Sequence, residues 1–193
     1  MLSYWYNYYT DKIVLALEIA NDTHKDQKDG IGVPYILHPY RVAAWYADDM
    51  SDQCPSAKEF EECYIIALLH DTIESKIDDL RLWGLNFDYS EISINQMIKE
   101  RYEQIKRSYI SDFGEEVANA VDILTRRKED TYNQYIDKVC KNKYATIVKI
   151  YDIRDNLDEN RMTRFTDEHR ESLKKRYEKA LEKLEKARNE FDK

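Results

Sequence analysis

Residues 64–75 read YIIALLHDTIES, an apolar run that leads directly into His70 and Asp71. Ser56 and Glu59 precede the run as an S-x-x-E capping box, which marks the beginning of a helix. We therefore expect a buried helix with His70 and Asp71 toward its far end. Burying an ionisable pair among apolar side chains costs free energy unless a partner compensates, and a divalent cation is the natural compensator.

The rest of the chain also predicts helices. It contains only 4 glycines and 3 prolines, and alternating strand patterns bounded by turn residues are hard to find. The segment 28–35, KDGIGVPY, holds two of the glycines and one proline and predicts a tight surface loop. The expected helices are 10–25, 40–50, one opening at Pro55 and Ser56, 93–109, 113–124, 132–139, 144–157 and one from Thr166 onward. The predicted fold class is all-α.

Length and pattern predict one domain with a helical extension. A chain of 193 residues suits one domain, which we place at residues 1–165. The helical pattern weakens over residues 77–112, where Gly84 and Asn86 are expected to break it, so we treat that stretch as an insertion. Residues 166–193 carry an apolar stripe between charged residues, which predicts an amphipathic helix packed on the domain or, alternatively, a coiled-coil-like partner surface. The second alternative would allow a homo-oligomer.

Composition limits the partners and the compartment. A net charge of -8 repels polyanions and argues against binding to extended nucleic acid. Cys54, Cys63 and Cys140 are odd in number and have no C-x-x-C spacing, so neither a disulfide framework nor a thiolate zinc site is indicated, and a reducing cytoplasm is the simplest location. The N-terminus does not resemble a signal peptide, and the apolar runs are too short to span a membrane.

Two further residues extend the candidate metal site. His38 precedes Pro39 at a junction between loop and helix, and Asp152 lies in the apolar run YATIVKIYDI, where a solvated carboxylate is hard to explain. A shell of His38, His70, Asp71 and Asp152 mixes nitrogen and oxygen ligands, which suits Mn²⁺, Fe²⁺, Zn²⁺ or Mg²⁺. Such a shell leaves positions open for water and substrate, so it indicates catalysis.

Two polar residues follow these ligands at helical spacing. Glu74 lies four residues after His70 and three after Asp71, so all three should project from one face of one helix. A carboxylate there would orient or deprotonate a water activated by the cation; the alternative is an ordinary exposed glutamate. Asn156, four residues after Asp152, would similarly reach the site, although an asparagine near a helix end is also a common surface feature.

Five segments, in four blocks, resemble a known family. They are THKDQ with GVPYILHPYRVA, then ALLHDTIES, FGEEVANAVDILTRR and IVKIYDIRDN, spread in the family's order over roughly residues 13–160. In this the chain resembles the HD superfamily, and within it the alarmone (p)ppGpp hydrolases of the RelA/SpoT type. The resemblance implies an HD-domain helical bundle with an additional C-terminal helix, one Mn²⁺ ion, and a water that attacks the 3′-pyrophosphate linkage of guanosine tetraphosphate. It places His38, His70, Asp71 and Asp152 at the metal positions, Glu74 at the first of two acidic catalytic positions, and Asn156 at a nucleotide-contacting position.

The chain departs from that family where the substrate is bound. Asp29 and Gly30 stand where the family has an Arg-Lys pair, and only Lys28 keeps a positive charge nearby. Ser75 stands where the family has a second carboxylate, and serine does not act as a base at neutral pH. Arg126 and its neighbour Arg127 are candidate phosphate clamps, with a solvated helix end as the alternative.

These patterns lead to one hypothesis with two alternatives. We expect a divalent-metal phosphohydrolase of a nucleotide, with ppGpp-like alarmones as first substrates. Because the guanine-reading positions differ, another phosphorylated or cyclic nucleotide is the second hypothesis. A nucleotide- or partner-binding module without turnover is the third, suggested by Ser75 and the charged C-terminal helix.

Overall fold

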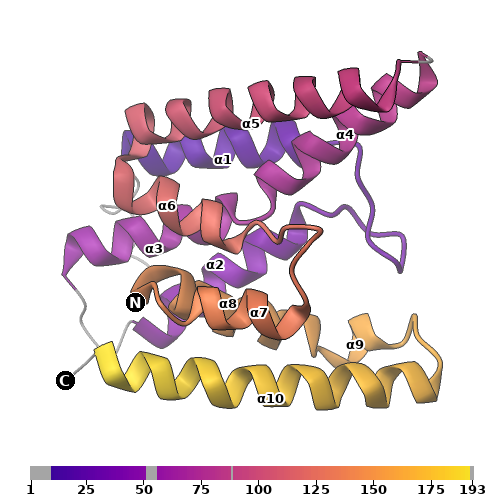
Figure 1. The fold of residues 1–193 in the computed structure, drawn as a ribbon. Helices are drawn as coiled ribbons and strands as arrows, with labels where there is room; N and C mark the ends of the chain where they lie inside the picture. Colours follow the sequence, from indigo (N-terminus) through magenta and orange to yellow (C-terminus); the bar gives the residue numbers. More distant parts are fainter. Residues whose placement is uncertain (1–9, 51–55, 88, 192–193) are drawn as a thin grey trace.

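The computed structural model describes residues 10–50, 56–87 and 89–191, and these form a bundle of helices (Figure 1). In chain order the helices are α1 (Asp11–His24), α2 (Leu37–Met50), α3 (Ala57–Leu69), α4 (Thr72–Asn86), α5 (Glu91–Phe113), α6 (Glu115–Leu124), α7 (Tyr132–Val139), α8 (Lys143–Asn156), α9 (Glu159–Met162) and α10 (Asp167–Phe191). Within the described residues the only β-type pairing is an isolated bridge between Lys28 and Pro34. The all-α prediction is confirmed, whereas Cys54 and Pro55 lie outside the described residues.

Helix α8 forms the centre of the bundle. Its residues are buried around the whole circumference, and it contacts α2, α3, α6, α7 and α10. A helix that is apolar on every side belongs in a core. Asp152 and Asp155 are the two buried carboxylates of this helix, so the fold carries two negative charges into its centre. Both must be compensated there.

Most predicted boundaries agree with the structure to within a few residues. Helix α7 has the predicted bounds, and α2 begins at Leu37, so that Pro39 lies in its first turn as predicted and His38 lies there as well. Gly114 separates α5 from α6 because it adopts a φ of 98°, a conformation that glycine reaches without strain. The short helix α9 was not predicted.

The expectation that Gly84 and Asn86 break the helix was wrong for Gly84 and is confirmed for Asn86. Helix α4 runs through Gly84 and ends at Asn86, and α5 returns beside it. Glycine is needed at position 84 for packing, because an ideal Cβ there would lie 2.7 Å from Cγ1 of the buried Ile94. The polar helix predicted over 93–109 forms the middle of α5. That residues 77–112 are an insertion stays a prediction.

The C-terminal helix packs on the bundle. Leu173, Ala180, Leu184 and Ala187 are buried, and α10 lies against α8 and α7, below them in Figure 1. Of the two alternatives for the C-terminal stripe, packing on the domain is the one observed. Cys63 and Cys140 are free thiols. Among the residues placed by the structure, no helix has the length and apolar character needed to cross a bilayer.

Candidate metal centre

A corner between two helices positions His70 and Asp71. Helix α3 ends at Leu69 and α4 begins at Thr72, so the expectation that His70, Asp71 and Glu74 share one helix was wrong. The Thr72 hydroxyl donates to the Leu69 carbonyl at 2.6 Å and thereby secures the corner. Asp71 precedes α4 at a position where aspartate is favoured, with Glu74 in the first turn, and this D-x-x-E pattern is itself a start of a helix.

The four predicted metal ligands converge from three parts of the chain. His38 comes from the first turn of α2, His70 and Asp71 from the corner, and Asp152 from α8. His38 Nε2 lies 3.1 Å from Asp152 Oδ1 and 3.6 Å from Asp71 Oδ2. His70 Nε2 lies 3.2 Å from Asp71 Oδ2 and 3.8 Å from Asp152 Oδ1. The ligand atoms of His38, His70 and Asp71 all lie within 4.8 Å of one another, and Asp152 Oδ1 lies beside the two imidazoles.

The second nitrogen of each imidazole fixes its orientation. His70 Nδ1 lies 2.8 Å from the Ala67 carbonyl, which only accepts, and His38 Nδ1 lies 2.7 Å from the Asp155 carboxylate. Both Nδ1 atoms therefore carry protons, so in the neutral form each ring would present its Nε2 lone pair to the cluster. The two Nε2 atoms lie 3.3 Å apart. Two lone pairs at that distance repel each other unless a metal ion or a proton lies between them, so the residues fit a cation.

The carboxylates strengthen this demand for positive charge. Burial lowers the pKa of His70, but the nearby Asp71 and Asp152 outweigh it and raise the pKa to about 9. The pKa of His38 is likewise raised, since the hydrogen bonds to Asp152 and Asp155 outweigh burial. Burial would raise the pKa of Asp152, yet Lys149 and the two histidines hold it well below its usual range. The cluster thus favours ionised carboxylates around a positive centre.

A surrounding layer of charged residues was missed by the sequence analysis. Asp155 is fully buried and orients His38, and its two oxygens also accept from Arg41 at 2.6 Å and Arg161 at 2.8 Å. Lys149 donates to Asp152 Oδ2 at 2.6 Å. Such outer contacts hold the ligand rings and carboxylates in place. The available signal was helical spacing: Lys149 and Asp155 lie three residues to either side of Asp152 in the buried helix α8.

Tyr35 holds the remaining ligand. Its hydroxyl donates to Asp71 Oδ2 at 2.5 Å, and its ring lies against those of His24 and His38. Burial beside Asp71 raises the pKa of this phenol far above its usual value, so it stays a donor. Tyr35 follows Pro34 in the 28–35 loop, and the loop thereby reaches the metal centre.

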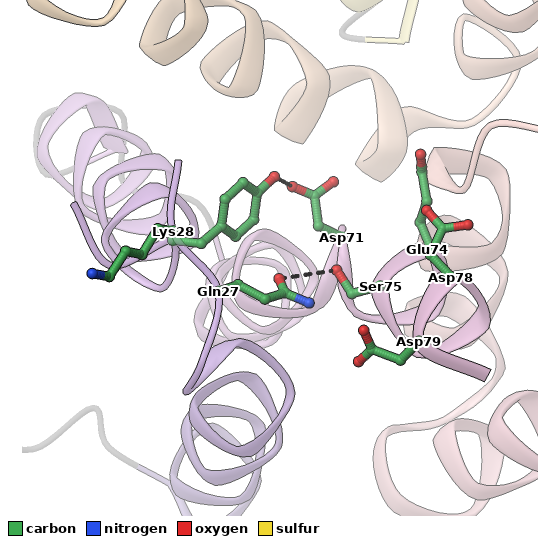
Figure 2. A pocket seen from close by; sticks show the side chains of 8 residues that line it. Gln27, Lys28, Asp71, Glu74, Ser75, Asp78 and Asp79 are labelled. Atoms are coloured by element: carbon green, nitrogen blue, oxygen red, sulfur yellow. Dashed lines mark hydrogen bonds between the residues drawn. The ribbon is translucent and has the colours of Figure 1, made fainter. Parts of the chain in front are cut away.

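An acidic pocket opens beside the cluster. It has a volume of about 420 Å³, and Figure 2 shows its side chains: Gln27, Lys28, Tyr35, Asp71, Glu74, Ser75, Asp78 and Asp79. Four of these are carboxylates, and the one cation, Lys28, points away from them. Partial burial raises the pKa of Glu74, and the charges of Asp71 and Asp78 raise it further. A carboxylate with a raised pKa at the mouth of the pocket is suited to take up a proton.

The residues predicted to bind substrate lie at different depths. Asn156 touches the cluster, because its Nδ2 donates to Asp152 Oδ1 at 2.7 Å. Arg126 is exposed after α6, and its charge acts on Glu74, while its guanidinium donates to the Asp130 carbonyl. Its neighbour Arg127 is engaged with Asp122 at 2.6 Å. Of the two candidate clamps, Arg126 therefore keeps a guanidinium without a carboxylate.

An arginine from a distant segment lies beside Asp29 and Gly30, where the resembling family has an Arg-Lys pair. Asp29 Oδ1 accepts from the backbone N–H groups of Ile31 and Val33 at 2.9 and 3.2 Å, so its charge faces its own loop. Beside it, Arg164 fills the space where residue 30 would have a side chain, since an ideal Cβ on Gly30 would lie 2.5 Å from Arg164 Cδ. Arg164 lies over the Phe165 ring and forms no ion pair with any described carboxylate. A cation thus stands at this position after all, supplied from a distant part of the chain.

Ser75 is part of a polar chain below the pocket. Its hydroxyl donates to Gln27 Oε1 at 3.4 Å, a bond drawn in Figure 2, and the same oxygen lies 2.8 Å from His24 Nδ1. Ser75 therefore ties α4 to the end of α1. It adds no second carboxylate to the site.

Comparison with known proteins agrees with this geometry. The HD domain family model matches residues 35–157. A guanosine-3′,5′-bis(diphosphate) 3′-pyrophosphohydrolase of Aquifex aeolicus (strain VF5) is 28% identical over 160 residues, which cover 79% of this chain and 18% of that protein. The chain therefore spans less than a fifth of that relative's length. A solved structure of a metazoan ortholog of SpoT, described as hydrolysing ppGpp with a role in starvation responses, has a TM-score of 0.60 at 21% identity and covers 91% of this chain and 86% of its own.

Proposed function

The chain belongs to the HD domain family, and from that premise we propose that it is a divalent-metal-dependent phosphohydrolase of a nucleotide, with guanosine-3′,5′-bis(diphosphate) 3′-pyrophosphohydrolase-like activity. The observation that carries the proposal is the convergence of His38, His70, Asp71 and Asp152 with both Nε2 atoms facing inward. We place the hydrolase domain at residues 1–165, with residues 166–193 as a helix packed on it. We place the protein in the cytoplasm, which the free thiols Cys63 and Cys140 support.

The four ligands would hold one divalent ion, for which we propose Mn²⁺. Two imidazoles and two carboxylates also accept Fe²⁺, Zn²⁺ or Mg²⁺, so the ligand types favour these four ions. When bound, such an ion polarises a phosphoryl oxygen and acidifies water. Tyr35, Asp155 and Lys149 hold the ligands in position, so little reorganisation is needed when charge develops.

Glu74 is the residue that we propose to handle the proton. It stands in the first turn of α4, at the pocket mouth and next to Asp71. Its raised pKa brings its basicity closer to what a base needs near neutral pH. Ser75 replaces the family's second carboxylate, and its hydroxyl is hydrogen-bonded to Gln27. Glu74 would therefore transfer the proton without the help of a second acidic residue.

The charges around the pocket suggest how a nucleotide lies in it. Asp78 and Asp79 line the wall that faces away from the ligand cluster, and carboxylates there would accept hydrogen bonds from the N–H edge of a guanine base. The phosphates would then face the cations, for which we propose Lys28 and Arg126 from the two flanking loops. Asn156 would act at the metal end, beside Asp152.

The test is hydrolysis by metal-loaded protein. Protein incubated with Mn²⁺ and guanosine tetraphosphate should release pyrophosphate, and Asp71→Asn should abolish release because it removes a ligand. Asp137→Asn is the matched control: Asp137 forms an exposed ion pair with Lys183, and this variant should keep full activity. Absence of turnover across a full panel of phosphorylated nucleotides would refute the proposal.

Another phosphorylated or cyclic nucleotide is the second candidate. Asp29, Gly30 and Ser75 favour it, because the Asp29 carboxylate accepts from its own loop, and Gly30 and Ser75 carry no charge. The same panel decides between the two. Turnover of a different nucleotide, with guanosine tetraphosphate inert, would establish this second candidate.

A further inference from the structure

The far end of the α4–α5 hairpin exposes a cluster of apolar side chains. This hairpin tip consists of Leu82, Trp83, Leu85, Phe87, Tyr89 and Ile92. Ile92 is 84% exposed and Phe87 63%, while the Trp83 ring lies 5.4 Å from the Tyr89 ring in a stacked arrangement and 5.1 Å from the Phe87 ring in a tilted one. The three aromatic side chains pack on one another and still leave much of their surface in water. Soluble chains seldom expose so large a connected apolar surface without a partner.

We propose that the hairpin tip is a self-association surface, which pairs with the hairpin tip of a second copy of this chain about a two-fold axis. In Figure 1 this end of α4 and α5 extends past the body of the bundle at the upper right. Two copies can therefore bring their tips together without contact between the bodies. A two-fold interface needs one patch that is complementary to itself, and a cluster of stacked aromatic rings meets that need.

The exposed area matches what one side of a dimer requires. The six side chains leave roughly 600 Å² of apolar surface in water, counting about 150–250 Å² for each whole side chain. A standard interface buries about 800 Å² on each partner, of which somewhat more than half is apolar, or about 500 Å². The hairpin tip alone supplies this amount. A short peptide would cover only part of it.

Charge also favours a second copy as the partner. Residues 82–98 contain two charged side chains, Asp88 and Glu91, although 35% of the whole chain is charged. Since each copy carries a net charge of -8, two copies approach with less repulsion through a surface that holds few charges. Interface centres are depleted in charged residues in the same way and enriched in aromatic ones.

The contact leaves the candidate active site open. None of the six hairpin-tip residues lines the pocket, whose last lining residue on α4, Asp79, lies three residues before Leu82. A monomeric variant should therefore keep its nucleotide hydrolysis, so a failure of this proposal is distinguishable from a failure of the proposed function.

The test is the mass of the full chain in solution. Light scattering after size exclusion should give twice the 23.2 kDa of one chain at tens of micromolar. Phe87→Ser with Ile92→Ser should weaken association about 100-fold and return the mass to that of a monomer. The matched control is Val14→Ser with Ile110→Ser, two exposed apolar positions away from the hairpin tip, which should leave the dimer intact.

Two results would overturn the proposal. One is a wild-type chain that stays monomeric at about 100 μM, and the other is a tip variant that dimerises as well as the control. Circular dichroism verifies that the variants stay helical. Should the double tip variant lose helix, Ile92→Lys takes its place, since this most exposed position tolerates a polar residue and would set like charges against each other across the axis.

Discussion

The candidate metal centre and the hairpin tip are both exceptions to the rule that apolar side chains are buried and charged ones exposed. The metal centre buries charged side chains, and the hairpin tip exposes apolar ones. At the metal centre, His38, His70 and Asp152 are almost completely buried, whereas the hairpin tip leaves Phe87 and Ile92 mostly exposed. Buried polar groups persist because each has a partner, and exposed apolar groups persist where another surface covers them. The two regions lie at opposite ends of one helix, α4, which begins beside Asp71 and ends at the tip. The contrast indicates that functional sites are found where the exposure of a side chain does not match its polarity.

The largest effect should come from removing one charge from the metal centre. Asp152→Asn removes a ligand and leaves the buried Lys149 without its carboxylate, so the free energy of unfolding of metal-free protein should fall by about 3 kcal/mol. Adding Lys149→Met should restore most of that stability but no metal binding. Leu85→Ser at the tip, measured on the monomer, should change stability by less than about 0.5 kcal/mol. Chemical denaturation and calorimetric metal titration measure both quantities.

One result would contradict this prediction. If Asp152→Asn lowered the free energy of unfolding no more than Leu85→Ser, the charges of the metal centre would not stabilise one another. Equal metal affinity in the double variant and in the wild type would remove Asp152 from the ligand set.

A smaller effect on metal affinity is expected from Asp155, which contacts a ligand but is not one itself. Asp155→Asn keeps all four ligands but weakens the bonds that orient His38 and that hold Arg41 and Arg161. Metal affinity should fall about 10–100-fold, as is usual for outer partners of a ligand histidine. Titration with Mn²⁺ followed by calorimetry tests this, with Asp137→Asn as the exposed control. Unchanged affinity would mean that His38 is held by packing alone.

The sequence predicted the metal centre better than its surroundings for a physical reason. His38, His70, Asp71 and Asp152 were recognisable because each stands in or beside an apolar run, where a charged group needs explanation. Their convergence in space fits that explanation. The helices were predictable for the same reason, since their apolar stripes recur at helical spacing.

What the sequence could not predict depends on contacts between distant segments. Gly84 looked like a helix breaker because only the structure places Ile94 against it. The corner at His70 was hidden because the apolar run continues into Ile73, and the Thr72 bond that turns the chain leaves no periodic pattern. Arg164 was missed because its position next to Gly30 follows from the packing of the α9–α10 connection on the loop.

A substitution pair at the loop tests that last contact. If Arg164 supplies the cation that residue 30 lacks, Arg164→Gln should raise the KM for the hydrolysed nucleotide about 10-fold and leave kcat unchanged. Gly30→Lys combined with Arg164→Gln should recover the affinity, because the lysine takes the freed space. Gly30→Lys alone should not improve binding, since its Cβ would meet Arg164. A double variant no better than Arg164→Gln would show that this position does not contact substrate.

The smallest effect should arise where α4 and α5 touch, between the two regions. Gly84→Ala would gain about 1 kcal/mol of helix propensity but would force a Cβ to within 2.7 Å of Ile94 Cγ1. Overpacking of a buried branched side chain costs about 1–3 kcal/mol, so the net loss of stability should be about 1 kcal/mol. Adding Ile94→Ala removes the Cγ1 that the new Cβ would meet, so the loss of stability in the pair should be smaller than the sum of the losses of the two single variants, measured by thermal unfolding. Because the contact also sets the distance between the two helices, Gly84→Ala should weaken dimerisation through the hairpin tip while metal affinity stays unchanged. A Gly84→Ala protein more stable than the wild type would show that α4 and α5 separate freely, and the hairpin could then not hold a rigid interface.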